Sequence, residues 1–145
     1  MKSVLFLFSF LFLQFFYACN NSDKEQKEAN TSENDVDAAR NFIRAALDGQ
    51  YSKARTFMLR DSLNTQLLDA FETNYQQRMS KDDKRGYREA SINMHNVRQL
   101  NDSVTIVNYS NSFKKKNDSL KIIHINNQWL VDFKYSFQGT DSSKR

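Results

Sequence analysis

Histidine is the side chain whose ordinary pKa lies nearest to neutral pH, and this chain has two, His95 and His124. His124 alternates in step with Leu120 and Ile122, which predicts that it faces the packed side of a strand. There it can serve as an acid, a base or a ligand, or it can be an ordinary structural histidine. No Asp, Glu or Cys stands at a metal-ligand spacing from either histidine, so the sequence predicts no metal and no other cofactor.

A carboxylate and a phenol inside one cavity would be a second route to catalysis. Asp132 alternates with Trp129 and Phe133, which predicts that it faces the opposite side of a strand. Tyr75 and Tyr109 can line a cavity, but without a paired carboxylate a phenol more often belongs to a core or a rim. A non-catalytic binding or interaction module is therefore the main functional prediction, and an enzyme of the isomerase or hydratase kind is the alternative.

The predicted domain carries an aromatic set that consists of Phe57, Phe71, Tyr75, Tyr109, Trp129 and Phe133. They can line an apolar pocket of the kind that holds small ligands, or they can simply fill the core. The predicted pocket lining is Tyr75, Tyr109, His124, Trp129 and Phe133.

The only cysteine, Cys19, stands where an apolar run ends. Lys2 followed by the run 4–18 has the layout of a secretory signal peptide, and the run is shorter than the roughly 20 residues that a spanning helix needs. The alternatives are an uncleaved signal anchor and a cysteine without a special role.

The four residues 16–19, Phe-Tyr-Ala-Cys, resemble the lipobox of bacterial lipoproteins, although the first two are bulkier than usual. The resemblance implies that the Cys19 thiol takes a diacylglycerol and that signal peptidase cuts between Ala18 and Cys19. Residues 1–18 are then a lipoprotein signal peptide, and palmitate-type acyl chains anchor the mature protein to a membrane.

Residues 19–34 are almost entirely polar and predict a flexible tether. Asn20 is not the aspartate that resembles an inner-membrane retention signal, which favours the outer membrane of the cell envelope. The stretch 22–25, Ser-Asp-Lys-Glu, resembles the acidic export tags of Bacteroidetes-type surface lipoproteins, or it is plain linker. The domain can lie on the periplasmic side or on the cell-surface side of that membrane, and the sequence leaves both alternatives.

The rest of the chain changes its hydrophobic period from about 3.6 to 2 near Ala90. Helices first and a strand meander afterwards predict an α+β fold, with N-terminal helices packed on one face of a curved antiparallel sheet of about four strands. We expect helices at 36–47, at 51–58 and from Asp61-Ser62 into the charged segment 81–88. Asp35 or Asp37 can cap the first helix and Gly49 should end it. The apolar face of the third helix is predicted to carry Leu63, Leu67, Ala70, Phe71 and Tyr75. We expect strands at 91–98, 104–110, 120–125 and 129–135, with an Asn126-Asn127 turn before the last.

Two segments carry a resemblance to a family. Residues 38–54, which contain Leu-Asp-Gly-Gln-Tyr-Ser-Lys-Ala, and residues 127–132, Asn-Gln-Trp-Leu-Val-Asp, resemble small Bacteroidetes-type lipoproteins with a cone-shaped nuclear-transport-factor-2-like (cystatin-like) domain. Their domain belongs to the domain of unknown function 4878 family. The resemblance implies a cone-like domain at 35–137 and a polar tail at 138–145. It carries almost no information on function, because this scaffold hosts many activities.

The charge balance is weak evidence about partners. A formal net charge of +4 without a clustered basic face predicts no nucleic-acid partner. Lys114, Lys115 and Lys116 either meet anionic lipid headgroups or form a solvated hairpin tip. The partners that remain are the membrane, a small apolar ligand, another envelope protein, or a second copy paired through the sheet.

Three Asp-Ser-apolar triplets resemble the O-glycosylation site of Bacteroidetes-type secreted proteins. Asp-Ser is also ordinary cap and turn chemistry, so both interpretations stand. The candidate modified residues are Ser62, Ser103 and Ser119.

Overall fold

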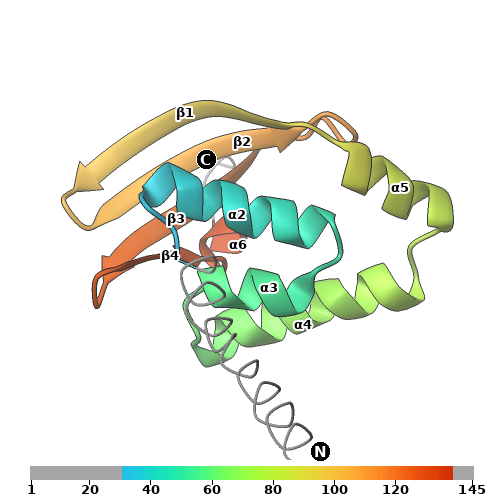
Figure 1. The fold of residues 1–145 in the computed structure, drawn as a ribbon, viewed down its shortest axis with the longest axis horizontal. Helices are drawn as coiled ribbons and strands as arrows, with labels where there is room; N and C mark the ends of the chain where they lie inside the picture. Colours follow the sequence, from blue (N-terminus) through green and yellow to red (C-terminus); the bar gives the residue numbers. More distant parts are fainter. Residues whose placement is uncertain (1–30, 139–145) are drawn as a thin grey trace, which may run out of the picture.

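The computed structural model describes residues 31–138, which form a curved four-stranded antiparallel sheet with helices on one side (Figure 1). The predicted α+β class is therefore confirmed. The sheet order is β1-β2-β3-β4, so each strand pairs with its neighbour in sequence. The elements are α2 (Asp35–Leu47), α3 (Tyr51–Ala54), η1 (Arg55–Phe57), α4 (Ser62–Gln77), α5 (Lys81–Glu89), β1 (Ile92–Asn101), β2 (Val104–Asn111), β3 (Asp118–Ile125), β4 (Gln128–Asp132) and α6 (Tyr135–Gln138).

Helix α2 crosses the sheet and provides the centre of the core. Its first turn is capped by Asn34, whose side-chain oxygen accepts a hydrogen bond from the Asp37 amide at 2.9 Å, an interaction worth about 1 kcal/mol. Asp35 instead accepts a hydrogen bond from Thr105 on β2 at 2.6 Å. The buried core of the domain consists mainly of Ala38, Ala39, Phe42, Ile43, Phe57, Leu68, Val107, Leu120, Ile122 and Val131.

The end of α2 positions one wall of the functional site described below. Gly49 has φ +75°, and the amides of Gly49 and Gln50 bond to the carbonyls of Ala46 and Ala45, the pattern of a Schellman cap. A Cβ at Gly49 would stand 2.5 Å from the ring of Tyr75. Glycine is therefore required here both by the backbone and by the close approach of that ring.

Helix α4 buries only part of the face that the sequence predicts. Leu67 and Tyr75, on the predicted face, pack against the core, but Leu63 and Phe71, on the same face, are 49% and 46% exposed. The most buried positions of the helix are Leu68 and Asn64, at 1% and 0% exposed. Asn64 is buried because its amide donates to Asp61 and Asp132 and its carbonyl accepts from the Lys134 amide. A satisfied polar side chain holds the core position, which hydrophobic periodicity cannot reveal.

The charged segment after α4 was expected to end that helix, and this expectation is wrong. Helix α4 stops at Gln77, and Ser80 caps a separate helix α5 by accepting from the Asp83 amide at 3.0 Å. None of the residues of α5 is buried. The apolar pattern could not reveal α5, because Tyr87 is its only large apolar side chain. The helix is held by the Ser80 cap and by packing of Tyr87 on Phe113.

The last strand is shorter than predicted. Asn126 and Asn127, both with positive φ, make the expected turn before β4, as in a type I′ hairpin. Strand β4 then ends at Asp132, and the short helix α6 replaces its predicted continuation to 135. At the edge of the sheet, Met58 forms a parallel bridge with Val131.

Asp132 is the most buried charge of the described chain, with a side chain 3% exposed. Its two oxygens accept from Lys121 and Lys134 at 2.7 Å and from Asn64 at 3.1 Å. Burial raises the pKa of Asp132, but these hydrogen bonds outweigh it and hold the pKa below its usual value. The cluster joins β3, β4 and α4 outside the cavity described next.

Candidate functional site

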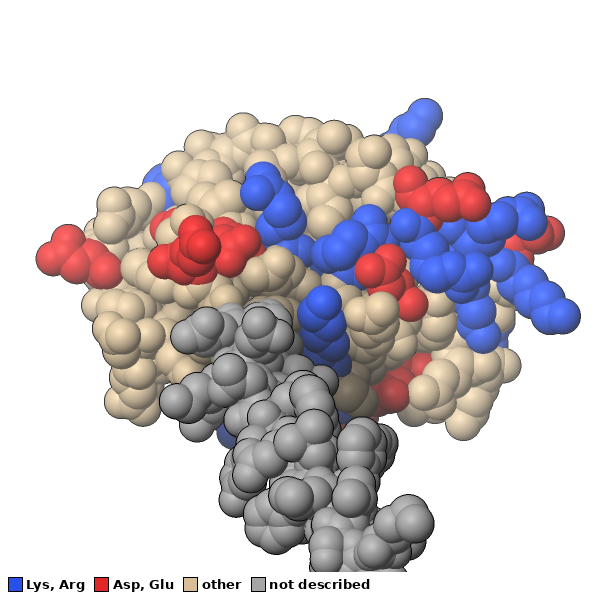
Figure 2. Space-filling model, viewed as in Figure 1, with Lys and Arg blue, Asp and Glu red and all other residues tan. Residues whose placement is uncertain are grey.

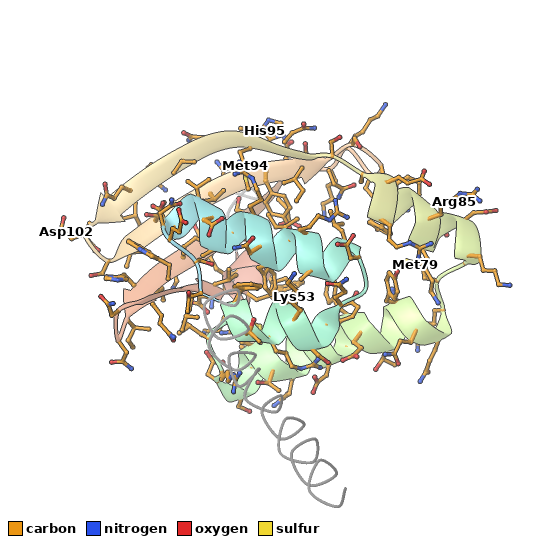
Figure 3. All side chains as sticks on the ribbon, in the orientation of Figure 1. Lys53, Met79, Arg85, Met94, His95 and Asp102 are labelled. Atoms are coloured by element: carbon orange, nitrogen blue, oxygen red, sulfur yellow. The ribbon has the colours of Figure 1, made fainter. Side chains whose placement is uncertain are left out.

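A cavity of about 400 Å³ lies at one end of the domain. Its walls come from the second half of α2, from α3, α4 and α5, from the connection between β2 and β3, and from α6. In Figure 3, Met79, which lines the cavity, lies between α4 and α5, at the opposite end of the molecule from Asp102 in the β1–β2 turn. The cavity therefore occupies the end of the sheet where α5 stands away from it (Figure 1).

Four phenylalanines make the apolar wall and its rim. The Phe133 ring lies 5.2 Å from Phe42, 5.3 Å from Phe71 and 5.3 Å from Phe137, measured between ring centroids. These separations are typical of edge-to-face and tilted aromatic packing. Phe71 and Phe137 are 46% and 42% exposed, so the aromatic wall continues from the interior out to the solvent-facing rim.

Four tyrosines, Tyr51, Tyr75, Tyr87 and Tyr109, form the rest of the aromatic lining. Burial, followed by the nearby Tyr75, Glu72 and Tyr87, raises the pKa of Tyr51 to about 12. Burial and then the Asp118 carboxylate raise the pKa of Tyr109 above its usual value. Both phenols therefore stay protonated at neutral pH and can donate hydrogen bonds, but they are poor bases.

Two tyrosines that line the cavity, Tyr51 and Tyr109, have hydroxyls with no hydrogen-bond partner among the described residues. No buried side-chain nitrogen or oxygen in the described chain lacks a hydrogen-bond partner, and neither of these hydroxyls makes a hydrogen bond within residues 31–138. Both oxygens must therefore touch open space, and both residues line the cavity. They offer two donors to a bound molecule.

The charged groups of the cavity lining, Lys114, Lys116 and Asp118, all lie at the β2–β3 end, together with Asn111. Asp118 is the direct register partner of Tyr109, so the two side chains lie next to each other on the cavity side of the sheet. Lys114 lies 3.9 Å from Asp83. Lys116 has no ion-pair partner among the described residues.

Helix α5 and the β2–β3 connection hold each other at the rim. The Tyr87 and Phe113 rings pack edge to face at 5.1 Å, and a Cβ at Gly86 would stand 2.4 Å from the Phe113 ring. The Lys114 ammonium lies over both rings, at 5.7 and 5.0 Å. The absence of a side chain at Gly86 allows this close contact.

Cations lie along the α5 side of the rim as well. Lys84 lies 5.2 Å from the Tyr75 ring centroid, and Arg88 is 3.5 Å from the Tyr75 hydroxyl. Figure 2 shows Lys and Arg side chains gathered over the end of the molecule where α5 lies, with a few acidic residues among them. The mouth of the cavity is therefore more positive than negative.

The structure brings three of the five predicted pocket residues together, because Tyr75, Tyr109 and Phe133 line the cavity. His124 and Trp129 do not, and their prediction as lining residues needs correction. Their rings stack on each other 4.4 Å apart as register partners close to the β3–β4 turn. The predicted strand face is compatible with this contact, but the pair stands at the other end of the strands from the cavity.

The remaining predicted residues lie elsewhere. Ser62 and Ser103 are exposed, whereas Ser119 lies within β3 rather than in a turn, and its hydroxyl donates to Asn108 at 2.8 Å. A sugar on Ser119 would have to break that bond. Ala18 and Cys19, with the predicted signal peptide and most of the tether, lie outside the described residues.

Sequence reasoning missed Asp118 and α5 as parts of the cavity, and it assigned Lys116 to a lipid surface or a solvated hairpin tip rather than to the cavity lining. Asp118 belongs to an Asp-Ser-Leu triplet that we interpreted as a modification site or a turn. Its pairing with Tyr109 depends on the β2–β3 register. The sequence does not define where β2 ends and β3 begins, so the register between these two strands cannot be deduced from it.

Comparison of the chain with protein-family models, with curated proteins and with solved structures finds no match. Within residues 31–138, no group of three or more His, Cys, Asp or Glu side chains is placed to hold a metal ion. No helix of the same described range has the length and apolar character needed to cross a membrane.

Proposed function

We propose that the domain binds a small, largely apolar molecule without changing it chemically, and that lipid on Cys19 holds the domain at the cell envelope. The single observation that carries the binding role is the cavity of about 400 Å³, with aromatic walls that continue to an exposed rim. Its size falls within the usual range of ligand sites, about 300–1,000 Å³. The protonated phenols of Tyr51 and Tyr109 would orient a polar group of the ligand.

A photoreactive probe tests the binding role. The full chain, anchored in phospholipid vesicles, is irradiated with an eight-carbon alkyl alcohol that carries a diazirine, and the modified peptides are mapped by mass spectrometry. We expect labelling on the cavity walls of α2 and α4. Ala46→Trp should abolish it because Ala46 lines the cavity, whereas Ala70→Trp, on the exposed face of α4, should not.

Two results would contradict the binding role. Cavity peptides that carry no more label than the outer face of the sheet would show that the probe does not enter. Equal labelling of the Ala46→Trp variant and the wild type would show that the cavity is not the site. The urea-unfolding midpoint of each variant confirms that it is folded.

The anchoring role is supported by the resemblance of residues 16–19 to a lipobox. Two or more acyl chains on Cys19 would give stable attachment, where a single chain is marginal. We expect Cys19→Ala to abolish incorporation of a clickable fatty acid in cells, and we expect the outer membrane to be the site of the wild type. Undiminished labelling of the variant would refute this role.

An isomerase- or hydratase-type activity is the second candidate, favoured by one observation. Asp118 and Tyr109 are register partners beside the cavity, a carboxylate base next to a phenol donor. Neither His124 nor Asp132, the other acid–base candidates, lines the cavity. If ligand is recovered unchanged after prolonged incubation with the wild type, this candidate fails; if it is converted, Asp118→Asn should stop the conversion.

Self-association through the sheet has weaker support. Strand β1 is an edge strand whose Val97 and Leu100 are 44% and 48% exposed. Irregularities at 94–96 and 99–101 interrupt its pairing register, and such bulges discourage edge-to-edge addition of another strand. Sedimentation of the chain would detect a dimer.

A further inference from the structure

We propose that the ligand of this cavity is a single-chain amphipath with an anionic head, a carboxylate or a phosphate, held at the β2–β3 end beside Lys116. This inference rests on the binding role proposed above and adds the chemical class of the ligand. It follows from the uneven distribution of apolar and charged groups around the cavity.

The apolar part of the ligand has a defined place. Phe42, Phe71 and Phe133 line the side formed by α2, α4 and the end of β4. A cavity of about 400 Å³ is near the lower end of the range for ligand sites. It suits one short alkyl chain or a small ring system better than a lipid with two chains.

The charged part has a defined place as well. Two of the three charged residues that line the cavity are Lys114 and Lys116, and the third is Asp118. Lys84 and Arg88 approach the lining residue Tyr75 from α5. These four cations outnumber Asp118 and Asp83, the partner of Lys114. Glu72, a further carboxylate near Tyr51, is paired with Arg55 at 2.7 Å. This end of the cavity therefore favours an anion.

Lys116 is the cation best placed to serve a ligand. Lys114 is engaged by two aromatic rings and by Asp83, so it also holds the rim together. Lys116 is exposed, lines the cavity and has no ion-pair partner among residues 31–138. The Tyr109 phenol, protonated at neutral pH, lies on the neighbouring strand and can donate to the same head group.

The chain itself provides a matched control. Lys115 lies next to Lys116 in the same connection and is also exposed, with a positive φ of 56°, but it does not line the cavity. Lys115→Gln and Lys116→Gln therefore change the net charge by the same amount, and only the second removes a charge from the cavity lining. Each variant is compared with the wild type for one ligand at a time, which cancels differences in partitioning into the vesicles.

The experiment measures displacement of the diazirine probe from cavity peptides of the vesicle-anchored full chain at pH 7.5. The competitors are octanoate, octyl phosphate, octanol and octylammonium. We expect Lys116→Gln to weaken displacement by octanoate or octyl phosphate by about threefold to fivefold, as for one partly exposed ion pair. Lys115→Gln should change neither by more than about 1.5-fold, and octanol should respond to neither substitution.

Three outcomes decide the inference. The expected pattern supports it, and the anion that responds more identifies the head group. If octanol displaces the probe but Lys116→Gln leaves both anions unaffected, or if octylammonium is the strongest competitor, the anionic head is overturned while the binding role stands. If no octyl compound displaces cavity label, the binding role itself fails.

Discussion

Replacing Asp132 by asparagine removes the buried carboxylate that joins β3, β4 and α4. Removing one partner of a fully buried ion pair costs about 3–5 kcal/mol, because it leaves the other charge without compensation. In this domain Lys121 and Lys134 are 27% and 25% exposed, so water recovers part of the loss. Lys134 also keeps Asp61 at 2.6 Å. We therefore expect Asp132→Asn to lower the free energy of unfolding by about 2–3 kcal/mol at pH 7.

The intrinsic fluorescence of Trp129, the only tryptophan in the chain, reports urea unfolding of the vesicle-anchored protein. A denaturant slope of about 1–3 kcal/mol per molar converts the expected loss into a midpoint lowered by about 1–2 M. Asp69→Asn is the matched control: Asp69 is 54% exposed, and its partner Arg55 keeps Glu72 at 2.7 Å. It should cost less than about 1 kcal/mol.

The pH dependence of stability tests whether the charge of Asp132 is the cause of the loss. Because the folded pKa of Asp132 is lowered, its contribution is complete above the unfolded pKa of about 4. The contribution is lost as the pH falls through the folded pKa. The difference in midpoint between wild type and Asp132→Asn should therefore shrink as the pH falls below about 4. Equal midpoints at pH 7, or a difference that grows as the pH falls below about 4, would refute the reasoning.

Three further substitutions test local features, each by the same urea titration. A Gly→Ala change inside a helix normally stabilises it by about 1 kcal/mol, but Gly86→Ala should give no gain in stability because its Cβ would clash with the Phe113 ring. The gain should return when Gly86→Ala is made in the Phe113→Ala background. A full gain from Gly86→Ala with Phe113 in place would contradict the contact. Gly49→Ala should cost about 1–2 kcal/mol through its positive φ and the Tyr75 ring, and a neutral result would contradict the cap. Asn34→Ala should cost about 1 kcal/mol, whereas an unchanged midpoint would show that the Asp37 amide does not need its acceptor.

Features set by neighbouring residues were predictable from the sequence. Asp61 caps α4 as expected, because its carboxylate needs only the Asn64 amide three residues on. Gly49 ends α2, and the Asn126-Asn127 turn precedes β4, because both depend on residues that adopt positive φ easily.

Features set by distant partners were not predictable. The burial of Asn64 depends on Asp132 and Lys134, about 70 residues further along the chain. The position of His124 at the far end of the sheet and the pairing of Asp118 with Tyr109 both depend on strand register. Periodicity identifies the face of a strand, but it does not say which end of that face meets a cavity.

The most direct measurement of the binding role is a set of nuclear Overhauser contacts between a ligand and the cavity walls. We would record them for octanol with the full chain in lipid bicelles, with isotope labels in the rings of its tyrosines. We predict contacts from the octyl protons to Tyr51 and Tyr109, which line the cavity, and their loss in Ala46→Trp. Contacts confined to Tyr135, which does not line it, or contacts that survive Ala46→Trp, would contradict the account.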